Sequence, residues 1–302
     1  MGARLVPRDL HFNVNGITLA AQAWGHEGGL PILALHGWLD NSASFNRLIP
    51  LLQMDVSQQG HYSDFYIVAL DLAGHGQSGH RLGQSSYTLW DDINDVFTVA
   101  DQLGWHQFSL LGHSRGGIVG TLAAGTFPQR INALALIEGF IPDAAAAEDA
   151  PQQLANALQG LQTYKQKPRS IYPTIELAIK ARARGMFPLS MAAAKALTER
   201  GIKMVPEGVY WSTDPLLLAP SVMKLTQAQI HAFVNRITAP INLLLGDGGL
   251  PQIYPNYLAE VALFGQVNTK LLSGGHHLHM ESQVQEVALH LNYFFSKLSL
   301  HC

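Results

Sequence analysis

The sequence predicts an α/β fold: a mostly parallel, eight-stranded sheet with helices on both faces. Three observations support this prediction. Short continuous apolar segments alternate with segments of helical periodicity over most of the chain, as in parallel sheets built from βαβ units. A Gly-x-Ser-x-Gly pentapeptide at residues 112–116 stands between a predicted strand and a predicted helix, which is the setting of a sharp strand-to-helix turn. The alternation stops at about residues 141–238, where helices alone are predicted.

The first part of the chain has the spacing of short strands and turns. Asn15-Gly16 joins apolar segments at 12–14 and 17–24, and such a pair between two strands predicts a β-hairpin. Continuous apolar segments then predict buried strands at 31–35, 65–70, 108–111 and 131–137. Helices are predicted between them at 43–53, at 87–103 with Ser85 or Ser86 as N-cap, and at 117–124.

The elements predicted in the rest of the chain divide it into two structural units. Helices are predicted at about 151–165, 173–184, 190–201 and 226–236, with prolines between them. After Pro240 the alternation returns, with strands at 241–245 and 267–272 and helices at 254–263 and 281–297. We therefore expect a core domain of residues 1–140 and 239–302, with a helical cap of residues 141–238 inserted after the sixth strand.

Composition excludes several classes of function. The 302 residues, 47% of them hydrophobic and 14% charged, suffice for a large core. A net charge of −3 without a basic run argues against nucleic-acid partners and against binding to a membrane surface. No apolar segment reaches the length of about 18 residues that a spanning helix needs, and the N-terminus lacks the apolar stretch of a signal peptide. With Cys302 as the single cysteine, no intrachain disulfide can form, and we expect a cytoplasmic protein.

The pentapeptide at 112–116 makes Ser114 the candidate nucleophile. A serine at a strained turn presents its hydroxyl above the sheet, but the hydroxyl needs a neighbouring base to react. His276 is the first candidate for the base because it follows Gly275, directly after the last predicted strand. His279 is the alternative, whereas His277 is expected to point elsewhere. Closely spaced histidines are also typical of metal sites, but no carboxylate or cysteine pattern accompanies them, so we expect no metal and no cofactor.

Two carboxylates compete for the role of the acid that orients the base. Asp247 follows the strand after the predicted cap, and Glu138 follows the strand before it. The residues alone leave this choice open. For the oxyanion that develops on a carbonyl substrate, the predicted donors are the backbone N–H groups of Arg115, next to the serine, and Trp38, in the loop after the third strand.

A glycine-rich segment at 71–78 resembles a phosphate-binding loop only superficially. Its glycines do not open a helix, as those of a dinucleotide fingerprint do. We therefore predict a structural turn in which Asp71 holds neighbouring loops together.

Together these residues resemble the α/β-hydrolase superfamily over nearly the whole chain. The resemblance rests on residues 36–38, 71–78, 112–117 and 275–276. More narrowly, residues 36–41, 44–45, 47–52, 71–78 and His276-x-x-His279-Met280 resemble the serine hydrolase-like, kraken-type branch, whose members are poorly defined in substrate. The resemblance implies a triad of serine, acid and histidine.

The resemblance also bears on the acid. The superfamily usually carries the acid three residues after the glycine that ends the late strand, and here that position is Gly249, which weakens Asp247. Some haloalkane dehalogenases of the superfamily carry it at the end of the earlier strand, which favours Glu138. Those enzymes and the related epoxide hydrolases use an aspartate nucleophile, so Ser114 argues against both reactions.

The predicted activity is hydrolysis of a carboxylic ester or thioester through an acyl-enzyme. The substrate is expected to be of small to medium size. Its acyl or alcohol part is expected to be apolar, because the predicted cap is rich in alanine, leucine and aromatic residues. Two alternatives remain: a carbon–carbon bond hydrolase or perhydrolase on the same triad, and a ligand-binding protein without turnover. The oligomeric state is left open.

Overall fold

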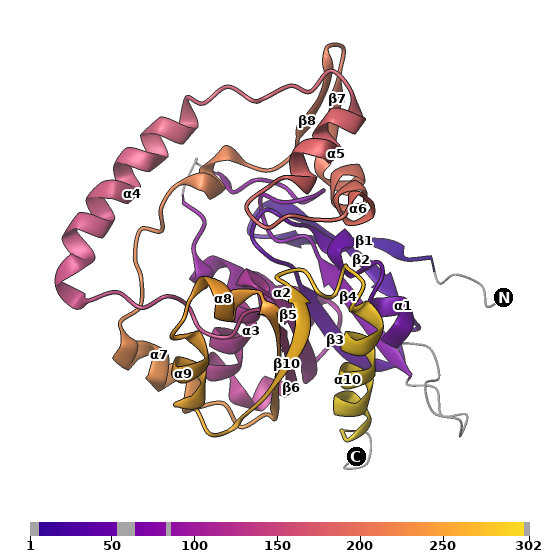
Figure 1. Ribbon diagram of the computed structural model, residues 1–302, viewed down its shortest axis with the longest axis vertical. Helices are drawn as coiled ribbons and strands as arrows, with labels where there is room; N and C mark the ends of the chain where they lie inside the picture. Colours follow the sequence, from indigo (N-terminus) through magenta and orange to yellow (C-terminus); the bar gives the residue numbers. More distant parts are fainter. Residues whose placement is uncertain (1–5, 53–63, 83–85, 299–302) are drawn as a thin grey trace.

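The core of the molecule is one eight-stranded sheet with the order β1-β2-β4-β3-β5-β6-β9-β10 (Figure 1). The computed structural model describes residues 6–52, 64–82 and 86–298, so Ser85 and Cys302 lie outside the described residues. The strands are β1 (Arg8–Val14), β2 (Ile17–Trp24), β3 (Leu30–Leu35), β4 (Phe65–Leu70), β5 (Phe108–His113), β6 (Ile131–Ile137), β9 (Ile241–Gly248) and β10 (Val267–Gly275). Strand β2 pairs antiparallel with β1 and β4, and every other pair in this sheet is parallel. The predicted mostly parallel sheet is confirmed.

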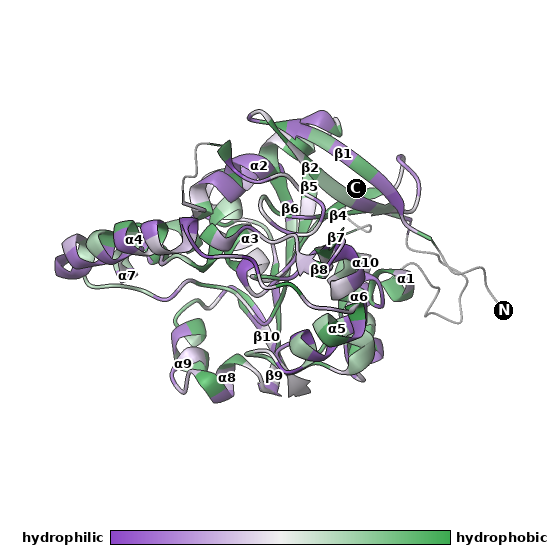
Figure 2. Ribbon diagram, turned by 90° about the horizontal axis from the view of Figure 1, so that it is seen from above, coloured by the Kyte–Doolittle hydropathy of each residue, from purple (hydrophilic) through white to green (hydrophobic). Residues whose placement is uncertain are grey.

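Helices cover both faces of the sheet. One face packs against α1 (Ile49–Leu52) and α10 (Val284–Ser296). The other packs against α2 (Leu89–Gln102), α3 (Arg115–Thr126), α7 (Gln227–Val234) and α9 (Tyr257–Ala262). Alternate residues of the central strands enter opposite cores, because successive strand side chains point to opposite faces. In Figure 2 the strands are mostly apolar, and hydrophilic residues lie on the outer surfaces of the surrounding helices.

The predicted hairpin at Asn15-Gly16 is present. Both residues have positive φ, 49° and 80°, as a two-residue turn of type I′ requires. The turn places β1 beside β2 from Val14–Ile17 to Arg8–Ala23.

Prolines break two of the predicted helices. The segment predicted as a helix at 43–53 forms a 3₁₀ turn, Ser42–Phe45, and the short α1, with Pro50 in its first turn; residue 53 lies outside the described residues. The predicted helix at 254–263 forms α8 (Leu250–Ile253) and α9, separated around Pro255. Proline lacks an N–H and clashes with the preceding turn of a helix, but it is tolerated in a first turn. A new helix therefore begins at Ile49, next to Pro50, and Pro255 lies between two helices. Helix α2 is capped by Thr88 rather than by Ser86.

The segment between β6 and β9 contains helices and one hairpin that we did not predict. Its helices are α4 (Ala150–Lys165), α5 (Ile175–Ala183), α6 (Met191–Gly201) and α7, with 3₁₀ turns at Ala147–Asp149 and Pro215–Leu218. The hairpin pairs β7 (Ile202–Val205) with β8 (Gly208–Trp211). Its strands are short and half exposed, so they lack the continuous apolar run that marks a buried strand. Figure 1 shows α4 standing away from the sheet, whereas α5, α6 and the hairpin lie together above it.

Buried polar bonds join this segment to the sheet. Arg200 of α6 pairs with Asp71 at 2.9 Å, and Trp38 donates from its indole nitrogen to the carbonyl of Leu217 at 3.0 Å. Asp71 also accepts from the backbone N–H of Ser42 at 2.7 Å and of Gln77 at 2.9 Å. These contacts show Asp71 holding loops together, as its predicted role requires. Within the described ranges, no helix is both long and apolar enough to cross a bilayer.

Candidate active site

Ser114 lies between β5 and α3 in a strained backbone conformation, with φ 50° and ψ −117°. Helix α3 lies so close to β3 and β5 that there is no room for a side chain at either glycine that brackets Ser114. A Cβ at Gly116 would overlap the carbonyl of Leu35, and a Cβ at Gly112 would lie 2.6 Å from the carbonyl oxygen of Gly116. The glycines of the pentapeptide therefore permit the turn that lifts Ser114 above the sheet.

Backbone strain concentrates around this serine. Four described non-glycine residues have positive φ: Asn15, Leu39, Ser114 and Glu138. The last three line one cavity with a volume of about 870 Å³, over the carboxyl ends of β3, β5 and β6. Such conformations cost roughly 1–3 kcal/mol each and persist where the surrounding structure enforces them. Their concentration marks this cavity as the candidate active site.

Of the two candidate carboxylates, the structure brings Glu138 to the histidine. Glu138 is fully buried, and its Oε2 atom accepts a hydrogen bond from Nδ1 of His276 at 2.9 Å. The carboxylate also accepts from the backbone N–H of Gly246 at 2.6 Å and of Leu250 at 2.7 Å. Asp247 is exposed and instead accepts from the backbone N–H of Gly274 at 2.9 Å. Asp247 thus ties down the end of β10 and does not contact His276.

The position of the Glu138 carboxylate depends on the lack of a side chain at Gly249. A Cβ at position 249 would overlap the Glu138 carboxylate, with 2.5 Å to its Oε1 atom. The absence of a side chain at Gly249 therefore leaves the space that the carboxylate of Glu138 occupies.

The ring of His276 is held on two sides. Glu138 accepts from Nδ1, and the ring of Phe187 stacks on the imidazole at 4.0 Å between centroids with an interplanar angle of 23°. Ser114 and His276 both line the large cavity. No hydrogen bond joins the Ser114 hydroxyl to His276 or to any other described residue, so the expected direct contact is not made here. Catalytic hydrogen bonds are often long in free enzymes and shorten when substrate binds.

The other two histidines of the cluster have different environments. His277 donates from Nε2 to Asp40 at 3.0 Å. His279 is fully buried against Phe45 and His113, without a hydrogen-bond partner for either ring nitrogen among the described residues. Burial lowers the pKa of His279 to about 3, so this ring stays neutral. His279 is not among the residues that line the cavity with Ser114.

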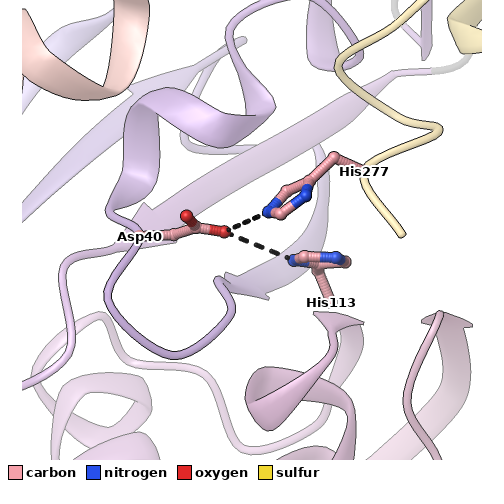
Figure 3. A group of neighbouring side chains, drawn as sticks. All are labelled: Asp40, His113 and His277. Atoms are coloured by element: carbon pink, nitrogen blue, oxygen red, sulfur yellow. Dashed lines mark hydrogen bonds and ion pairs between the residues drawn. The ribbon is translucent and has the colours of Figure 1, made fainter. Parts of the chain in front are cut away.

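Asp40, His113 and His277 form a buried group beside the active site (Figure 3). His113 donates from Nε2 to the backbone carbonyl of His276 at 2.9 Å, and its Nδ1 lies 3.7 Å from Asp40. Arg182 of α5 pairs with the other oxygen of Asp40 at 2.5 Å. Histidine and carboxylate are the ligand types of zinc, but here the guanidinium of Arg182 balances the carboxylate charge. The group joins the loop that carries His276 to the loop after β3 and to α5.

Electrostatics stabilise this group with Asp40 ionised. Burial raises the pKa of Asp40, but His277 and Arg182 outweigh it and hold that pKa well below its usual range. Burial lowers the pKa of His113 well below its usual range, with His279 and His276 acting in the same direction. A neutral His113 is consistent with its donation to the His276 carbonyl.

Trp38 and Arg115, whose backbone N–H groups are the expected oxyanion donors, both lie near Ser114: Arg115 follows it in the chain, and Trp38 lines the large cavity with it. Neither N–H group donates to another described residue. Arg115 opens α3, where the first amides have no partner within the helix. The side chains of these two residues have other partners: the indole of Trp38 donates to the carbonyl of Leu217, and the guanidinium of Arg115 pairs with Asp92 at 2.6 Å.

Several residues of the site were missed in the sequence. Asp40 and His113 lie within the segments 36–41 and 112–117, from which only Trp38, Ser114 and Arg115 were predicted as site residues. Each of the two contributes through a contact with a distant part of the chain. Phe187 and Arg182 belong to the segment between β6 and β9, where the sequence offers no pattern that points to the site.

Comparisons with known proteins show the family of the chain. Residues 31–169 match the model of the alpha/beta hydrolase fold family. The chain is 30% identical to human serine hydrolase-like protein 2, over 91% of this chain and 90% of that protein. A crystal structure of a hypothetical protein from Pseudomonas aeruginosa PAO1 is 42% identical, with a TM-score of 0.88 over 95% of this chain and 99% of that one. A thioesterase domain from the curacin biosynthetic pathway is 25% identical, with a TM-score of 0.80 and the same coverage. Fold, strained serine turn and relatives together show that this chain belongs to the α/β-hydrolase superfamily, among the serine hydrolase-like proteins.

Proposed function

We propose that this protein hydrolyses a carboxylic ester or thioester with the triad Ser114–His276–Glu138. The observation that carries the proposal is the buried carboxylate of Glu138 on His276, in the cavity that also contains the strained Ser114. A carboxylate on Nδ1 fixes the tautomer in which Nε2 is free to accept a proton. Nothing in the described site favours a carbon–carbon bond hydrolase or perhydrolase over this reaction.

The first half of the reaction forms the acyl-enzyme. His276 Nε2 takes the hydroxyl proton as Ser114 Oγ bonds to the carbonyl carbon, and the π electrons move onto the carbonyl oxygen. The backbone N–H groups of Trp38 and Arg115 stabilise that oxyanion. When the carbonyl re-forms, the bond to the alcohol or thiol breaks, and the imidazolium donates its proton to the departing oxygen or sulfur.

Water completes the cycle by the same steps. His276 takes a proton from water, whose oxygen bonds to the acyl carbon, and the bond to Ser114 Oγ then breaks. The imidazolium returns a proton to Oγ, and the carboxylic acid is released. Glu138 stays ionised and holds the imidazolium throughout.

The thioester alternative draws support from one relative. The curacin-pathway domain is named a thioesterase and matches 95% of this chain. The Ser114 chemistry is the same for both substrates, since only the leaving atom differs.

Covalent labelling of the folded protein tests the nucleophile. A fluorophosphonate probe should modify Ser114 stoichiometrically, as mass spectrometry of the peptide would show, and should leave Ser114→Ala unlabelled. Thr121→Ala is a control, because Thr121 is a buried hydroxyl on α3 that is not part of the site; it should label as the native chain does. Absence of label on Ser114 in folded protein would refute the proposal.

Gly249→Ala should lower kcat by about 100-fold while the protein remains folded, because a displacement of about 1 Å in a catalytic group has that effect. The added methyl overlaps the end of a side chain, the Glu138 carboxylate, which can move aside. Hydrolysis of an activated ester and the melting temperature would be measured together. Gly265→Ala, where a Cβ would meet nothing within 4 Å, should match the native chain in both; unchanged kcat in Gly249→Ala would show that the carboxylate position does not matter.

A further inference from the structure

Ser114 faces two cavities. Besides the large one, a smaller cavity with a volume of about 290 Å³ also has Ser114 in its lining. Besides the serine, the two share Trp38, Ile118, Pro142 and Asp143, so they meet at Ser114. His276 and Phe187 line only the large cavity, whereas Trp90 and Met223 line only the small one.

The position of His276 decides which part of the substrate enters each cavity. The base must later donate its proton to the leaving atom, so the leaving group has to lie on the side of His276. The acyl chain of the same substrate extends from the carbonyl carbon away from the leaving group. In the acyl-enzyme it therefore points to the side that His276 does not line.

The lining of the small cavity suits an uncharged chain. Its apolar side chains are Trp38, Leu89, Trp90, Ile118, Pro142, Met223 and Leu225. Met223 is 61% exposed and Trp90 and Trp38 are each 39% exposed, and exposed apolar side chains that gather around a hollow indicate a binding site.

Charges in this cavity are already balanced. The guanidinium of Arg115 pairs with Asp92 at 2.6 Å, and Lys224 pairs with Asp143 at 2.7 Å. A carboxylate or phosphate on the acyl chain would thus meet no unpaired cation there. The volume lies at the lower end of ligand pockets, which run from about 300 to 1,000 Å³.

We infer that the small cavity is the acyl-binding subsite and takes a short, uncharged, apolar acyl chain, while the large cavity takes a bulkier alcohol or thiol leaving group. This assignment rests on the proposed function, because it uses Ser114 as nucleophile and His276 as the proton donor. It names Trp90 and Met223 as specificity-determining residues for the acid part of the substrate.

Phosphonate inactivators test the assignment without a known substrate. In p-nitrophenyl alkylphosphonates the alkyl chain stands for the acyl chain, and Ser114 displaces nitrophenolate from phosphorus. Inactivation rates would be measured for butyl, hexyl and octyl chains on the native chain, Trp90→Ala and the matched control Tyr254→Ala. Tyr254 is 55% exposed and lines only the large cavity.

Trp90→Ala should raise the octyl-to-butyl rate ratio by at least about tenfold, since each buried methylene contributes about 0.8 kcal/mol. Tyr254→Ala should leave that ratio unchanged and should instead alter the preference among aryl leaving groups of different size on a fixed butylphosphonate. Met223→Trp, a change at an exposed position, should lower the octyl-to-butyl ratio. Circular dichroism would verify that each variant is folded.

Two results would overturn the assignment. An octyl-to-butyl ratio that rises in Tyr254→Ala but not in Trp90→Ala would place the acyl chain in the large cavity. Equal ratios in all the variants would show that the small cavity takes no part in binding. Failure of every inactivator to modify Ser114 in the native chain is a distinct result, because it refutes the proposed nucleophile itself.

Discussion

Replacement of Glu138 by glutamine should lower kcat by about 10³–10⁴, the loss that follows when a triad acid becomes an amide. The carboxylate accepts three hydrogen bonds, from Gly246, Leu250 and His276. Glutamine has one acceptor oxygen, so its NH₂ group must face either a backbone donor or the imidazole. An NH₂ group that faces a backbone N–H strains the loop, whereas one that faces the imidazole fixes His276 in the wrong tautomer. Steady-state hydrolysis of an activated ester measures the effect.

Asp247→Asn is the matched control for the acid. Asparagine keeps an acceptor oxygen for the backbone N–H of Gly274. Exposed substitutions of this kind change the free energy of unfolding by only about 0.5 kcal/mol. The loop should therefore keep its structure, and kcat should remain near that of the native chain. Glu138→Asp, which keeps the charge but shortens the reach, should retain more activity than Glu138→Gln. A large loss in Asp247→Asn together with normal turnover in Glu138→Gln would reverse the assignment of the acid.

Asp71→Ala should destabilise the fold by about 3–5 kcal/mol, the loss expected when one partner of a buried ion pair is removed. The substitution leaves the guanidinium of Arg200 with only the exposed Asp9, and it removes the acceptor for the N–H groups of Ser42 and Gln77. Urea unfolding at neutral pH, followed by tryptophan fluorescence, measures the free energy of unfolding.

Asp9→Ala provides the comparison, because Asp9 pairs with the same guanidinium at 3.2 Å but is 58% exposed. Exposed ion pairs contribute about 0–1 kcal/mol, so this variant should unfold close to the native chain. Equal losses in the two variants would mean that the burial of Asp71 does not set the energy of its pair.

The nucleophile could be predicted from sequence because its requirements are local. Glycines at 112 and 116 and the adjoining apolar segments together specify one turn, and the structure has that turn at Ser114. The acid could not be predicted in this way. Strands β6 and β9 are neighbours in the sheet and end at the same edge, so both Glu138 and Asp247 were plausible partners for a histidine that follows β10.

Other parts of the site depend on contacts that no local pattern encodes. Asp40 meets His277 across 237 residues of chain and Arg182 across 142, and neither pair has a characteristic spacing. Phe187 reaches His276 from the loop between α5 and α6, where no motif marks it. Two predicted helix boundaries were wrong for a simpler reason. The prolines at 50 and 255 lie inside segments whose apolar periodicity continues past them.

The overlap between Glu138 and any side chain at position 249 makes these two positions interdependent. A carboxylate can approach His276 from β6 only while β9 is followed by glycine at that point. To transfer the acid from one strand to the other in evolution, both positions would have to change. Either change alone passes through an impaired protein, with two groups competing for one space or with no acid at all. A sequence that carries the acid on β6 is therefore expected to keep glycine after β9, although neither the sheet nor the reaction requires a glycine there.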